Sequence, residues 1–176
     1  MPRDCVQDRE RKDRVPYTLW ESRGWIKFTA GSTTDYGVIE ADIIALATEF
    51  DLVELAYDPR EASQLAIGLP SWGLPVYEFH QNIVNYNEPT KELEALLRAG
   101  RLTHGSHPVL DWMAGNAAVL RDRQGRMRPL KPGRKLPDGQ WQADETKKVD
   151  GVQASVMALA RAMLAPAAAV VAIDFW

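Results

Sequence analysis

The segment DLVELAYDPREASQLAIGLPSWGLPVYEFHQ, residues 51–81, carries the pattern that decides the fold. Its first part is a short apolar run with strand-forming residues, stopped by Pro59. Residues 60–69 fit a helix closed by Pro70, and residues 74–81 have the composition of a second strand. The order strand, helix, strand favours a βαβ unit and therefore an α/β fold with an at least partly parallel sheet.

An aspartate directly follows the first of these predicted strands. Ligands of α/β sheets gather at the carboxyl ends of strands, and Asp58 lies at such an end. Asp58 also precedes Pro59, where an aspartate commonly serves as a turn residue. The local pattern leaves both interpretations open.

The segments before residue 51 are predicted from composition and spacing. Residues 15–31 carry aromatic and β-branched side chains around Gly24, which indicates a strand or hairpin. In residues 35–50, apolar side chains recur at helical spacing, which predicts a helix.

Two helices and a long loop are predicted after residue 81. Residues 87–104 indicate a helix with Pro89 near its start and Gly100 near its end. Residues 107–122 are predicted to be helical at first and then extended, and residues 123–148, rich in glycine, proline and charge, indicate a turn and a long loop.

The stretch TKKVDGVQASVMALARAM, residues 146–163, predicts a final helix that starts at Asp150. Val152, Val156 and Leu159 recur at helical steps. Asp150 then occupies the N-cap position, and Gln153 has the partner position of a capping box. Taken alone, this pattern favours a helix cap over a metal ligand.

Composition is typical of a single globular domain: 176 residues, 45% hydrophobic and 26% charged. The lone Cys5 excludes an internal disulfide framework, so we expect a cytoplasmic setting. Residues 1–14 are charged without an apolar core, which excludes a secretory signal. Residues 166–176 are apolar but too short to span a bilayer, so we expect no membrane segment and an apolar tail.

Positive charge is concentrated in one part of the chain. Residues 121–148 contain nine Lys and Arg and four Asp and Glu, although the whole chain has a formal net charge of −3. A basic segment leading into Asp150 would attract a polyanion while carboxylates collect a cation. The alternative is an ordinary solvated loop.

Several kinds of site are excluded by the absence of their motifs. No Walker loop is present, so we expect no ATP site, and the H-x-x-H pair of His104 and His107 lacks the cysteines or glutamate of a zinc site. No elbow motif for a catalytic serine occurs. The remaining candidates are carboxylates, which can hold Mg²⁺ ions for phosphodiester cleavage.

Four blocks in order identify a resemblance that covers residues 8–164. They are RKDRVPYTLWESRGWIKFTAGSTTDYGVIEADI, LAYDPREASQLA, FHQNIVNYNEPTKELEALLRAGRLTHGSHPVLDWMAGNAAVLRD and KKVDGVQASVMAL. With these blocks the chain resembles the C-terminal nuclease domain of the large terminase subunit of tailed bacteriophages. The resemblance implies an RNase H-like fold, with a mixed central sheet flanked by helices and an acidic cluster that binds two Mg²⁺ or Mn²⁺ ions.

The resemblance assigns roles to particular residues. It makes Asp58 and Asp150 catalytic metal ligands, and it gives His104 and Asn116, in the block HGSHPVLDWMAGN, supporting roles. The phosphate-binding candidates, all within the basic segment, are Arg126, Arg128, Lys131, Lys135, Lys147 and Lys148.

The family's ATPase domain and first nuclease strand, which supplies another metal-binding aspartate, have no counterpart among these residues. We therefore expect a sheet incomplete at its N-terminal strands. The expected division is a charged segment at 1–14, the nuclease domain at 15–165 and the apolar tail at 166–176.

The expected activity is metal-dependent cutting of concatemeric double-stranded viral DNA during packaging, in the bacterial host cytoplasm. The family's partners are the small terminase subunit and the portal protein. The alternative is a non-catalytic terminase fragment, from a prophage remnant or a split gene, that binds DNA, the portal or a complementary chain. A broader alternative is another RNase H-like nuclease, such as a junction resolvase.

Overall fold

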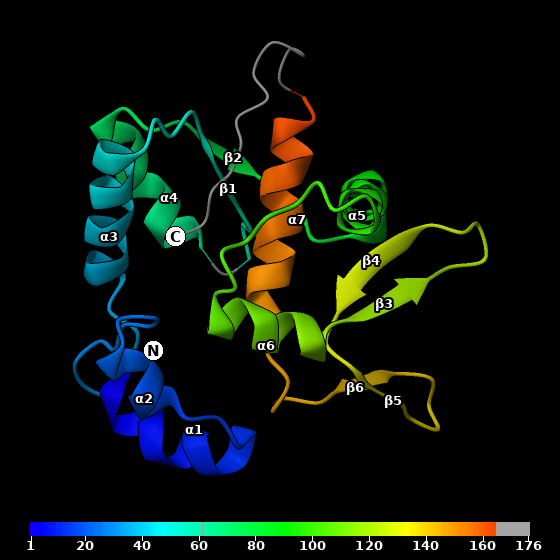
Figure 1. Ribbon diagram of the computed structural model, residues 1–176, viewed down its shortest axis with the longest axis horizontal. Helices are drawn as coiled ribbons and strands as arrows, with labels where there is room; N and C mark the ends of the chain where they lie inside the picture. The colour runs from blue at the N-terminus through cyan, green and yellow to red at the C-terminus, as the bar shows by residue number, and fades with distance from the viewer. Residues whose placement is uncertain (61, 165–176) are drawn as a thin grey trace. The chain divides into compact units, whose positions relative to one another are not determined.

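The computed structural model describes residues 1–60 and 62–164. The chain divides into two compact units, Met1–His80 and Gln81–Trp176. Their mutual placement is not determined (Figure 1), so each unit is described by itself.

The first unit contains one βαβ arrangement. Strands β1 (Leu55–Tyr57) and β2 (Val76–Glu78) are parallel, as the sequence predicted. In their register Leu55 lies opposite Val76. The helices of this unit are α1 (Val6–Asp13), α2 (Tyr17–Ser22), α3 (Tyr36–Glu49) and α4 (Ser63–Gly68), with 3-10 turns at Arg3–Cys5 and Leu69–Trp72.

The prediction of a strand or hairpin at residues 15–31 is wrong, because helix α2 occupies Tyr17–Ser22 and none of the named strands lies in this segment. Tyr17 and Trp20 are three residues apart on one helix face, and both are buried with their rings edge to face at 5.6 Å. The Tyr17 hydroxyl donates a hydrogen bond of 2.8 Å to the buried Asp13 carboxylate. Tertiary packing of these aromatic side chains overrides their preference for strands.

The helix predicted at residues 35–50 is confirmed as α3. Asp35 is its N-cap, because its Oδ1 accepts the backbone N–H groups of Gly37 at 2.9 Å and Val38 at 3.3 Å. These bonds satisfy donors that have no partner inside the helix.

The second unit combines three helices with two antiparallel hairpins. The helices are α5 (Ile83–Arg98), α6 (Pro108–Asn116) and α7 (Asp150–Ala162). The hairpin strands are β3 (Ala118–Arg121) with β4 (Met127–Leu130), and β5 (Gly133–Lys135) with β6 (Trp141–Ala143). The change from helix to extended chain around residue 118 is confirmed.

The long loop predicted at residues 123–148 is wrong, since β4, β5 and β6 lie within it. Met127 and Pro129 of β4 are buried while the residues between and after them are partly exposed, which is the two-residue period of a strand. Prolines and charged side chains interrupt the apolar alternation by which such short strands are recognised.

Helix α5 begins earlier than the sequence indicated. Asn82 caps it by accepting the N–H groups of Val84 and Asn85, each at 2.9 Å. Pro89 consequently lies inside the helix, where it removes one backbone hydrogen bond. The face of α5 that contains Pro89 is buried, together with Tyr86, Asn87 and Thr90.

The core of the second unit lies between α5, α7 and β4. Tyr86, Val149 and Val156 have no exposed surface. The buried amide oxygen of Asn87 accepts the N–H of Met127 at 3.0 Å, which joins α5 to the outer edge of β4. Because buried polar groups are costly without partners, this bond fixes the register of β4 against the helix.

The α/β class is thus confirmed, and the described part of the chain holds its strands in three two-stranded sheets. In that same part, none of the helices is long and apolar enough to cross a membrane. The apolar tail predicted at residues 166–176 lies outside the described residues, and the domain boundaries remain a prediction.

Alanine substitutions at two glycines should have opposite effects on stability. A Cβ at Gly133 would lie 2.2 Å from the backbone oxygen of Gln142 across the β5–β6 pair, whereas one at Gly115 in α6 meets nothing within 4 Å. We expect Gly133→Ala to open the hairpin and remove hydrogen-exchange protection there, and Gly115→Ala to raise unfolding free energy by about 0.5–1 kcal/mol. Unchanged protection in Gly133→Ala would contradict the strand pairing.

Candidate functional site

Asp150 is the first residue of α7, and its side chain does not cap the helix. The N-cap position belongs to Val149, which is fully buried, and no side-chain cap bond is formed. The predicted capping box is therefore wrong, because burial of the preceding valine moves the helix start by one residue. The Asp150 side chain is exposed, and among residues 1–60 and 62–164 it has no hydrogen bond or ion pair.

The segment before Asp150 is held by the end of α6. The Asn116 side-chain amide donates to the Lys148 carbonyl at 3.2 Å. At Gly151, an added Cβ would lie 3.0 Å from the Met113 sulfur and 3.1 Å from a Leu110 methyl carbon. This close approach brings the two helices together at the residue next to the candidate carboxylate.

Asp58 lies at the end of β1 and is half-buried. Its Oδ1 accepts the N–H of Arg60 at 3.1 Å, and its carbonyl accepts the N–H of Ala62 at 3.0 Å. These bonds form an Asx-type turn, so the turn interpretation of Asp58 is confirmed. A carboxylate with one oxygen in such a turn still has lone pairs for a cation.

The two predicted metal ligands belong to different units, with Asp58 in the first and Asp150 in the second. Within the described ranges, no group of three or more His, Cys, Asp and Glu side chains could hold a metal ion. Their joint role as a metal site therefore stays a prediction.

His104 lies in the connection between α5 and α6. Its Nδ1 is 3.5 Å from Oδ1 of Asp111 in α6, which places an ion pair there when the imidazole is protonated. The predicted supporting roles of His104 and Asn116 remain predictions. The contacts of Asn116 are with the backbone leading into α7.

Four of the six predicted phosphate-binding residues already have partners within the second unit. Arg126 pairs with Asp122 at 2.7 Å, and Arg128 donates to the Gln81 carbonyl at 3.1 Å. Lys131 pairs with a Glu145 oxygen at 3.3 Å, and Lys148 donates to the Glu145 carbonyl at 2.5 Å.

The turn between β3 and β4 is built on Asp122. Desolvation raises the pKa of this carboxyl, but the hydrogen bonds and charge of Arg126 outweigh it and hold the pKa below its usual range. Asp122 also accepts the N–H groups of Gln124 at 3.0 Å and Arg126 at 2.8 Å. Arg126 is consequently part of the turn as well as a candidate for DNA contact.

Lys135 and Lys147 are the two predicted DNA-binding residues whose side chains make no hydrogen bond or ion pair in the part of the chain described here. Lys135 is exposed on β5 and lies opposite Trp141, whose side chain is 52% exposed. Sequence reasoning gave Trp141 no role. The Pro-Asp-Gly turn at residues 137–139 was the signal that could have located this hairpin.

A family model described as the endonuclease domain of the terminase large subunit matches residues 1–165. The terminase large subunit of Enterobacteria phage HK97 is 34% identical over 166 residues, which cover 92% of this chain and 30% of that protein. Protein YmfN of Escherichia coli K12 is 32% identical over 168 residues, which cover 93% of this chain and 35% of that protein.

The crystal structure of the HK97 bacteriophage large terminase matches with a TM-score of 0.76 and 30% identity, over 92% of this chain and 32% of that one. The chain therefore spans about a third of the length of the relatives it matches.

The Asn116 bond gives a stability test. We expect Asn116→Ala to lower the free energy of unfolding by about 1 kcal/mol, because the Lys148 carbonyl loses its donor. Urea denaturation measures this loss, and Gln124→Ala, on the exposed β3–β4 turn, should change stability by less than about 0.5 kcal/mol. Equal stability of Asn116→Ala and the parent chain would show that the bond is unimportant.

Proposed function

Because the chain belongs to the family of terminase large subunit endonuclease domains, we propose that it is a divalent-metal-dependent endonuclease that cuts concatemeric double-stranded viral DNA during packaging. The family match over residues 1–165 is the observation that carries the proposal.

Asp58 and Asp150 are the proposed metal ligands. Their carboxylate oxygens are the hard donors that Mg²⁺ and Mn²⁺ prefer, and Mg²⁺ commonly uses one or two carboxylates with waters and substrate phosphate oxygens. The exposed Asp150 carboxylate has no competing partner in the described part of the chain. When bound, two such ions supply an activated water and stabilise the leaving oxygen of the phosphodiester.

The residues around Asp150 are proposed to position it. Val149 anchors the start of α7 by burial, and Asn116 holds the backbone two residues before the carboxylate. We propose a supporting role for His104 as well, on the family resemblance. A rigid backbone at Asp150 reduces the freedom lost when the carboxylate binds a cation.

Basic side chains of the second unit are the proposed contacts with DNA phosphates. Lys135 and Lys147 can bind phosphate without breaking an existing interaction in the described residues. Arg126, Arg128, Lys131 and Lys148 would exchange intramolecular partners for phosphate oxygens. Such contacts give affinity with little sequence readout.

A second candidate is a non-catalytic module that binds DNA, the portal protein or a complementary chain. It is supported by the basic side chains of the second unit, because those of Lys135 and Lys147 can contact phosphate without a metal ion. The family's small terminase subunit and portal protein are proposed partners under either candidate, in the host cytoplasm.

Plasmid cleavage separates the two candidates. We expect Mg²⁺- or Mn²⁺-dependent nicking by the purified chain, lost by roughly 100-fold or more in Asp58→Asn and in Asp150→Asn, since ligand loss should exceed the effect of outer-shell changes. Asp51→Asn, an exposed carboxylate in the first unit, is the matched control and should keep full activity. Absence of nicking by the parent chain, together with DNA binding, would favour the non-catalytic module.

The salt dependence of DNA binding tests the basic contacts. We expect Lys135→Ala and Lys147→Ala each to weaken binding and to reduce the slope of log affinity against log salt by about 1. Lys91→Ala removes a lysine paired with Glu88 on α5 and serves as the control. Fluorescence anisotropy with a DNA duplex gives these slopes, and equal slopes in all three variants would exclude both Lys135 and Lys147 from the interface.

A further inference from the structure

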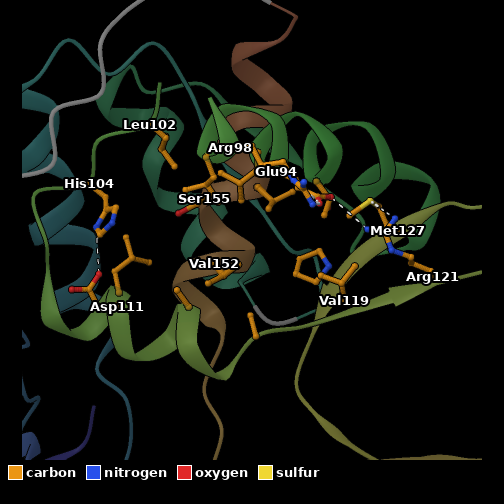
Figure 2. A pocket seen from close by; sticks show the side chains of 18 residues that line it. Glu94, Arg98, Leu102, His104, Asp111, Val119, Arg121, Met127, Val152 and Ser155 are labelled. Carbon is orange, nitrogen blue, oxygen red and sulfur yellow. Dashed lines mark hydrogen bonds and ion pairs between the residues drawn. The ribbon is translucent and has the colours of Figure 1, made fainter. Parts of the chain in front are cut away.

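The second unit contains a cavity of about 440 Å³ among α5, α6, α7 and the β3–β4 hairpin (Figure 2). This volume is within the range of small-molecule sites, roughly 300–1,000 Å³. Most of the lining is apolar, with Leu93, Leu97, Leu102, Val119, Val152 and Val156 among its residues. Such a surface favours an apolar occupant, because water gains few hydrogen bonds there.

Two buried polar atoms of the cavity lining, Thr90 Oγ1 and His104 Nδ1, have no hydrogen bond to any described residue, although His104 Nδ1 lies 3.5 Å from the Asp111 carboxylate. Thr90 of α5 lines the cavity and is 6% exposed, and its Oγ1 is buried without a hydrogen bond to any described residue. A buried hydroxyl without a partner is destabilising. An occupant with one hydrogen-bonding atom at this position would satisfy it.

The charges around the cavity are unequally distributed. Figure 2 shows Glu94, Arg98 and Arg121 on one side and His104 with Asp111 on the other. Arg98 lies 2.7 Å and Arg121 3.5 Å from the Glu94 carboxylate, so two guanidinium groups share one negative charge. The hydrogen bond from Arg98 is the main cause that holds the pKa of Glu94 below its usual range.

We infer that this cavity is a binding site for a small apolar anion. The apolar body of the ligand lies among the leucine and valine side chains, and its anionic group is directed to the side of Arg98 and Arg121, where positive charge is in excess. Thr90 provides the hydrogen bond inside. The site is distinct from the proposed metal ligands, but Val152 and Ser155 of its wall belong to α7, which begins with Asp150.

Two probes with one aromatic framework test the inference on the full chain. 8-Anilinonaphthalene-1-sulfonate carries an anion, whereas N-phenyl-1-naphthylamine has the same rings without it. We expect fluorescence titrations to show one saturable site for each, with tighter binding of the sulfonate. Equal affinity for the two probes would overturn the inference that Arg98 and Arg121 attract the anionic group of the ligand.

Variants assign the binding to this cavity. Arg121→Gln should weaken sulfonate binding roughly threefold, the size expected for a partly exposed ion pair, and leave the uncharged probe unchanged. Arg123→Gln makes the same charge change in the same hairpin but outside the cavity lining, and it should affect neither probe.

Ala114→Phe and Val152→Phe place a ring into the cavity from two different helices, and each should reduce the affinity for both probes at least tenfold. Circular dichroism and a thermal melt identify variants that remain folded. Probe binding unchanged in a folded Phe variant would overturn the inference, because the probe would then occupy another surface.

Discussion

Burial of one face of α7 against α5 and β4 is the interaction on which the second unit depends. Val149, Val156 and Tyr86 are withdrawn completely from solvent, and each such side chain contributes about 1.5–3 kcal/mol through its apolar area. The same packing leaves Asp150, the neighbour of Val149, at the exposed start of the helix. Burial of Val149 thereby leaves the carboxylate of Asp150, a candidate metal ligand, in solvent. The Asp150 side chain itself makes no hydrogen bond in the described structure.

Part of the positive charge of the basic segment is compensated within the second unit. The Asp122 and Glu145 carboxylates form ion pairs with Arg126 and Lys131, whereas Lys148 donates to the neutral backbone carbonyl of Glu145. Exposed ion pairs of this kind contribute about 0–1 kcal/mol each. DNA phosphates can therefore replace these carboxylates as partners of the basic side chains at a small cost in folding free energy. The same side chains can thus stabilise the turns and bind a polyanion.

Much of the fold could be predicted from periodicity, and the failures have physical causes. The helix of residues 35–50 was recognised because its apolar side chains recur at helical spacing over a long segment. The βαβ order around Asp58 was recognised because short strand-like runs flank a helical segment and are bounded by Pro59 and Pro70. Residues 15–31 were misassigned because Tyr17 and Trp20 suit a strand and a buried helix face equally well. The predicted joint role of Asp58 and Asp150 as metal ligands cannot follow from local pattern, because the two residues are far apart in the sequence, and it rests on the family resemblance.

Helices α6 and α7 approach closely at Gly151 because glycine has no side chain. The sulfur of Met113 and a methyl of Leu110 occupy the space that a side chain at position 151 would need. Substitutions at these three positions should therefore show epistasis, in which a larger residue at 151 is tolerated only with a smaller one at 110 or 113. The volume available in α6 thus limits which sequences can follow the acid at the start of α7.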